Sequence, residues 1–79
     1  MGFAKTERDW AGRAARHLKA ELKRADVTYE ELAERLKAHG FSETKASISN
    51  KLARATVPAS FFLACLAALE LEGVRLEDI

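Results

Sequence analysis

The sequence Ser47-Ile48-Ser49-Asn50-Lys51-Leu52-Ala53-Arg54, at the centre of the stretch from Tyr29 to Leu69, decides the fold. In a helix Ile48 and Leu52 lie one turn apart and point the same way, which gives one branched, apolar face. The opposite face is small and polar, with Ala46, Asn50 and Ala53 at its centre and Ser47, Ser49 and Arg54 beside them. Small residues let a helix approach another surface closely. The floor of a DNA major groove, about 12 Å wide, is such a surface.

The composition favours a small helical domain. The chain has 79 residues, of which 48% are hydrophobic and 32% are charged, as in a compact soluble domain. One Pro and four Gly leave little room for a turn-rich β fold, and alanine and leucine outnumber β-branched residues. The single cysteine, Cys65, excludes an intramolecular disulfide and a multi-cysteine zinc site. We therefore expect an all-α fold.

Capping residues and apolar stripes mark out the elements. The expected N-caps of the first three helices are Thr6, Thr28 and either Ser42 or Thr44. Gly40 is placed to end the second helix, and Pro58 to be the first residue of the fourth. Residues 1–79 then form one domain, with helices at about 7–25, 29–39, 44–55 and 58–71 and a short closing segment at 74–79.

The fourth helix is apolar on all sides. One stripe, formed by Phe62, Cys65, Leu66 and Leu69, is expected to face the core. The other helices of so short a chain can hardly cover the remaining side as well, so we expect a homodimer. Its interface would consist of Phe61, Leu63, Ala64, Ala67, Ala68 and Leu71.

This order of elements resembles the helix-turn-helix domains of phage repressor and Cro type, the lambda-repressor-like fold. The resemblance rests on Leu32-Ala33, Ile48-Ser49, Ala68-Leu69, Val74 and Leu76-Glu77-Asp78-Ile79. The string from Ile48 to Arg54, followed by the string from Phe61 to Leu66, is similar to a small bacterial family of uncharacterised helix-turn-helix proteins. The resemblance implies a compact four- to five-helix domain, a third helix that enters the major groove of double-stranded DNA, and commonly a two-fold dimer.

The chain departs from that pattern between Leu32 and Ile48, where it is longer than the usual tight helix-turn-helix. The extra residues lie between Lys37 and Thr44. They predict a longer second helix, a longer turn or an extended third helix. The departure bears on which residues of the third helix reach the bases.

The candidate contacts follow from side-chain chemistry. We expect base contacts from Ser47, Ser49 and Asn50, since an Asn amide pairs with the N6 and N7 edge of adenine and Ser pairs with several bases. The expected phosphate contacts are Thr44, Lys45, Lys51, Arg54, Arg13 and Arg16. The basic face of the first helix, with Arg13 and Arg16, could equally lie on an anionic membrane or be solvated.

Charge is unevenly distributed along the chain. The formal net charge is only +1, which is low for a nucleic-acid-binding protein. Up to Arg54, however, twelve Lys and Arg residues stand against eight acids, and after it one Arg stands against four acids. A basic part and an acidic end suit a protein that approaches a polyanion with one side, and they also suit head-to-tail self-association.

Other function classes find little support in the sequence. It contains no phosphate-binding loop, no metal-ligand spacing and no nucleophile spaced to meet His17 or His39, so we expect neither an enzyme nor a metal or other cofactor. No stretch reaches the ~18 apolar residues that span a bilayer, and we expect a cytoplasmic protein without a small-molecule substrate. The alternative to a DNA-binding regulator is a helical interaction module that uses the apolar helix 58–71 and does not bind DNA.

Overall fold

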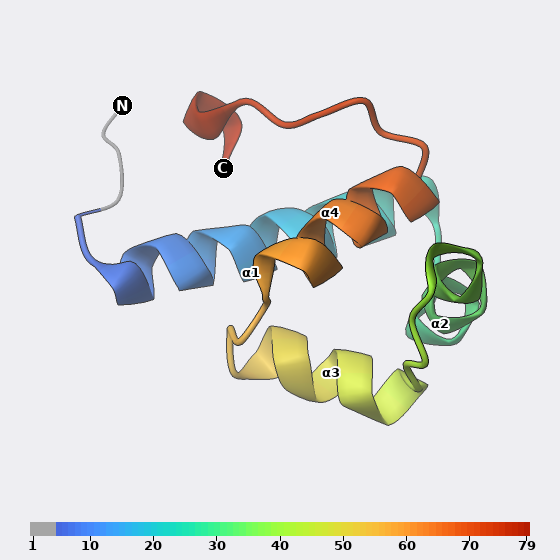
Figure 1. Cartoon of the computed structure of the whole chain (residues 1–79). Helices are drawn as coiled ribbons and strands as arrows, with labels where there is room; N and C mark the ends of the chain where they lie inside the picture. The colour runs from blue at the N-terminus through green and yellow to red at the C-terminus, as the bar shows by residue number, and fades with distance from the viewer. Residues whose placement is uncertain (1–4) are drawn as a thin grey trace.

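A computed structural model describes residues 5–79, and within that part of the chain the regular structure is entirely helical (Figure 1). The α-helices are α1 (Glu7–Ala25), α2 (Tyr29–Leu36), α3 (Lys45–Ala53) and α4 (Ala59–Ala68). Two 3-10 turns, Lys37–His39 and Leu76–Asp78, accompany them. The all-α prediction is confirmed. Residues 1–4, which the sequence analysis included in the domain, lie outside the described residues.

Threonine caps begin three of these helices, as expected. The Thr6, Thr28 and Thr44 hydroxyls accept hydrogen bonds from the backbone N–H three residues later, at 3.0, 3.1 and 3.0 Å. Thr44, and not Ser42, is therefore the cap of α3. Pro58 was predicted to be the first residue of the fourth helix. It is instead the N-cap, with an extended backbone (φ −62°, ψ 150°), and α4 begins one residue later, at Ala59.

The core forms where the four helices meet. α1 and α2 each pack against both α3 and α4, and Figure 1 shows α4 running along α1 with α3 below both of them. Seven large side chains are almost completely buried, namely Leu18, Leu32, Leu36, Ile48, Leu52, Phe61 and Cys65. Because every α-helix contributes to this cluster, each helix is held by apolar burial and not by its intrinsic propensity alone.

A longer turn accounts for the extra residues between α2 and α3. α2 ends at Leu36, the 3-10 turn follows, and Gly40 adopts a left-handed backbone with φ 84°. The Phe41 N–H then donates to the Leu36 carbonyl at 3.1 Å, and the Phe41 ring meets the Phe61 ring edge-on with centroids 6.2 Å apart. The second helix is thus shorter than the predicted 29–39, and the turn is fastened to the core by its aromatic residue.

The structure corrects the expected orientation of α4. The helix ends at Ala68, three residues before the predicted end. Phe61 and Ala68 were assigned to a contact between subunits, but they are only 1% and 7% exposed and belong to the core. Phe62 was expected to face the core. It packs against the core but is only half-buried, with its ring centroid 6.4 Å from that of His17.

The chain after α4 turns back over α1, where it ends beside the first half of that helix (Figure 1). Val74 and Ile79 are half-buried, whereas Leu76 is 53% exposed. This C-terminal segment, residues 73–79, therefore covers one side of α1 and adds little to the core. Within residues 5–79, no helix combines the length and the apolar character that crossing a membrane requires.

Candidate nucleic-acid interface

The outer face of α3 carries the residues that the sequence placed there, except Ser47. Ile48 and Leu52 are 0% and 2% exposed and anchor the helix in the core. The exposed residues of α3 and its two ends are Thr44, Lys45, Ala46, Ser49, Asn50, Ala53 and Arg54. Small side chains thus surround the Asn50 amide, and a cation lies at each end of the helix. We name Lys45, Ser49, Asn50 and Arg54 the α3 face.

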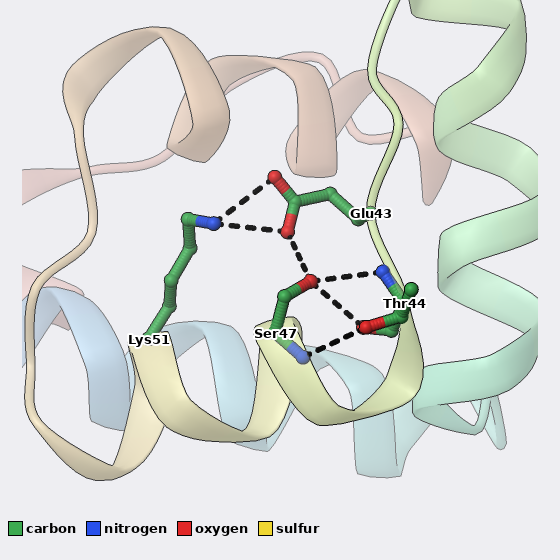
Figure 2. Close-up of polar contacts among 4 residues, drawn as sticks. All are labelled: Glu43, Thr44, Ser47 and Lys51. Atoms are coloured by element: carbon green, nitrogen blue, oxygen red, sulfur yellow. Dashed lines mark hydrogen bonds and ion pairs between the residues drawn. The ribbon is translucent and has the colours of Figure 1, made fainter.

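The inner side of α3 carries a polar cluster that the sequence analysis did not predict (Figure 2). Lys51 Nζ lies 2.9 and 3.0 Å from the two carboxylate oxygens of Glu43. Ser47 Oγ donates to Glu43 Oε1 at 2.6 Å and accepts a hydrogen bond from the Thr44 N–H at 2.8 Å. The cluster joins the end of the α2–α3 turn to the first two turns of α3.

Burial makes this ion pair different from one on the surface. The Glu43 side chain is 11% exposed and that of Lys51 is 27% exposed, and Lys51 Nζ lies 5.3 Å from the centre of the Phe61 ring. Burial alone would raise the pKa of Glu43, but hydrogen bonds from Ser47 and Lys51 and the charge of Lys51 together lower it. Glu43 is therefore held as a carboxylate at neutral pH.

This cluster engages two residues that were predicted to contact DNA, Lys51 and Ser47. Lys51 was expected to contact phosphate, but its ammonium group is bound to both oxygens of Glu43. Ser47 was expected to contact a base, but it is half-buried and its hydroxyl is engaged within the cluster. Ser47 and Lys51 are four apart on one side of α3, but Glu43 precedes the helix, so helical spacing alone could only have suggested the cluster.

The remaining α3 residues keep the positions that the sequence assigned to them, with two qualifications. The Thr44 hydroxyl, an expected phosphate contact, already caps α3. Lys45 Nζ lies 3.9 Å from Glu30 Oε1, and both side chains are largely exposed (68% and 74%). An exposed pair at this separation is weak, so Lys45 is able to exchange Glu30 for a phosphate.

Arg13 and Arg16 lie elsewhere. Both line a groove between α1 and the C-terminal segment, with Val74 and Arg75 on its other side. Figure 1 shows that segment and α3 on opposite sides of the pair formed by α1 and α4. The structure thus does not bring Arg13 and Arg16 together with the α3 face, because the side of α1 that carries them turns away from α3.

The outer side of α4 retains part of the expected interface between subunits. Leu63 is 64% exposed and Ala67 is exposed, while Ala64 and Leu71 are half-buried. With Phe61 and Ala68 in the core, the candidate interface reduces to these four residues.

Two further titratable groups, Cys65 and His17, have shifted pKa values. Burial, followed by the nearby charge of Glu43, raises the pKa of the Cys65 thiol to about 12, so Cys65 is a protonated core residue at neutral pH. Burial and then the charge of Arg24 lower the pKa of His17, against a smaller opposing effect of Asp78. Among residues 5–79, no three His, Cys, Asp or Glu side chains are grouped so that they could hold a metal ion.

Comparison with known proteins gives one result. A family model described as "Domain of unknown function (DUF6471)" matches residues 10–74. No curated protein and no solved structure matches the chain. The matched region begins in α1 and ends in the C-terminal segment, and it contains α2, α3, α4 and the Glu43–Lys51 pair.

Proposed function

The chain belongs to this family, the domain of unknown function DUF6471, and from the exposed side of α3 we propose that it is a small DNA-binding regulator. In this proposal α3 enters the major groove of double-stranded DNA. Asn50 pairs with adenine, Ser49 contacts a neighbouring base, and Lys45 and Arg54 hold the phosphates on either side. A homodimer would place two copies of α3 on a two-fold site.

The observation that supports the proposal is that α3 has one side buried in the core and one exposed side of short, polar residues. Its inner side is fixed by Ile48, Leu52 and the Glu43–Lys51 pair. Its outer side contributes almost nothing to the core, yet it carries an exposed amide among short side chains with a cation at each end. A helix face that is merely solvated usually carries Glu and Lys, not Ala, Ser and Asn. These features support close approach to a groove.

Removing the Arg54 charge is expected to weaken DNA binding and its salt dependence. We expect Arg54→Ala to bind random-sequence duplex DNA more weakly than the wild type. The slope of log K against log salt should become shallower by about 0.9 for the lost phosphate contact. Fluorescence anisotropy of a labelled duplex across a salt series measures both. Lys19→Ala is the matched control, because it removes an exposed cation from α1, outside the α3 face.

Asn50→Ala separates base reading from phosphate binding. After selection of a preferred duplex with the wild type, this variant should lose about 1–3 kcal/mol of preference for that site while its affinity for random DNA stays unchanged. Absence of any binding by the wild type at low salt and micromolar protein would contradict the proposal. Equal losses in Arg54→Ala and Lys19→Ala would contradict the assignment to α3.

A second candidate function is supported by the outer side of α4. Leu63 is 64% exposed on a helix whose neighbouring outer residues are apolar, which is typical of a contact between proteins. In this candidate the domain associates through Leu63, Ala64, Ala67 and Leu71 and does not bind DNA.

We expect the wild type to sediment as a dimer at tens of micromolar and Leu63→Glu to sediment as a monomer. Leu76→Glu is the matched control, because Leu76 is 53% exposed but lies on the C-terminal segment. A wild type that stays monomeric would contradict the homodimer. A dimer without affinity for DNA would favour the second candidate over the first.

A further inference from the structure

A groove of about 710 Å³ separates α1 from the C-terminal segment. Among the described residues that line it, the cations are all arginines, with Arg13, Arg16 and Arg24 on α1 and Arg75 on the segment. The acids of the lining are Glu21 and Asp78. Four arginines and two acidic side chains thus line the groove.

The ion pairs of the groove leave Arg16 and Arg75 able to bind an anion. The Glu21 side chain is 10% exposed and forms an ion pair with Arg24, so its charge is already compensated within α1. Arg75 Nε lies 2.8 Å from Glu77 Oε1, but the two side chains are 75% and 42% exposed, and an exposed pair of this kind is easily exchanged for another anion. Arg16 is exposed on the α1 side of the groove.

We propose that this groove binds a small phosphate-bearing ligand, held between Arg16 on α1 and Arg75 on the C-terminal segment. A phosphate group accepts charge-assisted hydrogen bonds from several directions, which suits guanidinium groups that approach from two separate elements. A carboxylate, in contrast, can receive both of its hydrogen bonds from the planar guanidinium group of a single arginine. The volume exceeds that of a phosphate group, and Ala20 and Val74 provide apolar wall for a small organic part.

The proposal is independent of DNA binding. The groove lies on the opposite side of the α1–α4 pair from α3, so the two sites share no residue. A bound ligand would join the C-terminal segment to α1 and hold it there. His17 lies in the lining and reports occupancy, because a nearby anion stabilises its charged form.

The test is a titration of the full, ¹⁵N-labelled chain with inorganic phosphate, pyrophosphate and phenyl phosphate, followed by NMR at constant ionic strength. We expect saturable shifts at Ala20, Gly73 and Val74 and at the His17 ring, but none at Asn50. Arg16→Gln and Arg75→Gln should each weaken binding about tenfold, as expected for loss of a hydrogen bond to a charged group. Tighter binding of phenyl phosphate than of the inorganic ion would show that the apolar wall holds an organic part.

Lys19→Gln is the matched control, because it removes an exposed charge from α1 at a position that does not line the groove. If Lys19→Gln weakens binding as much as Arg16→Gln, the attraction is diffuse and the site is refuted. Shifts centred on α3 would refute it as well. Arg16→Gln leaves the C-terminal segment intact, so its result stands even if Arg75→Gln displaces that segment.

Discussion

Replacing Phe61 with Ala is expected to lower the free energy of unfolding by about 3–5 kcal/mol. Phe61 is 1% exposed, its ring meets that of Phe41, and the ammonium group of Lys51 lies over it. Truncation would leave a cavity where α4, the α2–α3 turn and α3 meet. Small domains are stable by only about 5–15 kcal/mol, so this loss should be a large fraction of the total. Urea unfolding followed by circular dichroism measures it.

Leu63→Ala provides the contrast on the same helix. Leu63 is 64% exposed, and its truncation should change the stability of a single chain by less than about 0.5 kcal/mol. Both variants should be measured at protein concentrations low enough to dissociate any dimer. Similar losses in the two variants would show that Phe61 and Leu63 are equivalent, and the burial described for α4 would then be wrong.

The second large effect is expected at the Glu43–Lys51 pair. Lys51→Met keeps most of the aliphatic stem but leaves the Glu43 carboxylate buried without its cation. The expected loss is about 3 kcal/mol, the lower end for breaking a buried pair, since Lys51 is 27% exposed. Lys37→Met is the control. Its partner Glu34 lies at 2.8 Å, but the side chains are 62% and 72% exposed, and such pairs contribute about 0–1 kcal/mol.

A second substitution tests the cause of that loss. Adding Glu43→Leu to Lys51→Met removes both charges, and the double variant should recover most of the lost stability. If the double variant is as unstable as Lys51→Met, the loss comes from packing of the lysine stem and not from an uncompensated carboxylate.

The same pair should make stability depend on pH. The pKa of Glu43 in the folded chain lies below its ordinary value of 4.5. Its contribution is therefore complete above that value and is lost as the pH falls through the folded pKa. Without Lys51, burial raises the pKa of Glu43, so the variant is relieved of its buried charge at a higher pH. The difference in stability between the wild type and Lys51→Met should accordingly shrink as the pH falls from neutrality to below 4.5. A difference that stays constant under acidic conditions would contradict the role given to this carboxylate.

The sequence was informative wherever a local rule decides the structure. The threonine caps depend on contacts three residues apart, and the inward direction of Ile48 and Leu52 depends on helical periodicity alone. α4 offered no such rule. Its residues are apolar on every side, so nothing in the pattern marks Phe61 as fully buried and Phe62 as only half-buried. A small rotation of the helix separates the two readings, and only packing against α1 and α2 selects one.

The candidate site shows the same limit in its charged residues. Lys51 was expected to contact phosphate because of its charge, but its partner Glu43 lies outside the helix in the preceding turn. The path of that longer turn decides whether the two side chains meet. Arg13 and Arg16 were grouped with α3 by charge, whereas their position depends on where the chain after α4 returns over α1.

The two-sided construction of α3 has a consequence for how such a domain can diversify. The packing of α3 depends on Ile48, Leu52 and the Glu43–Ser47–Lys51 cluster. Ser49 and Asn50 are exposed on the outer side and do not contribute to the core. Related sequences are therefore free to exchange the outer residues of this helix for others of any preference without first acquiring compensating changes in the interior. A lineage that holds the inner set constant keeps one scaffold and is able to acquire new specificities on it, one surface substitution at a time.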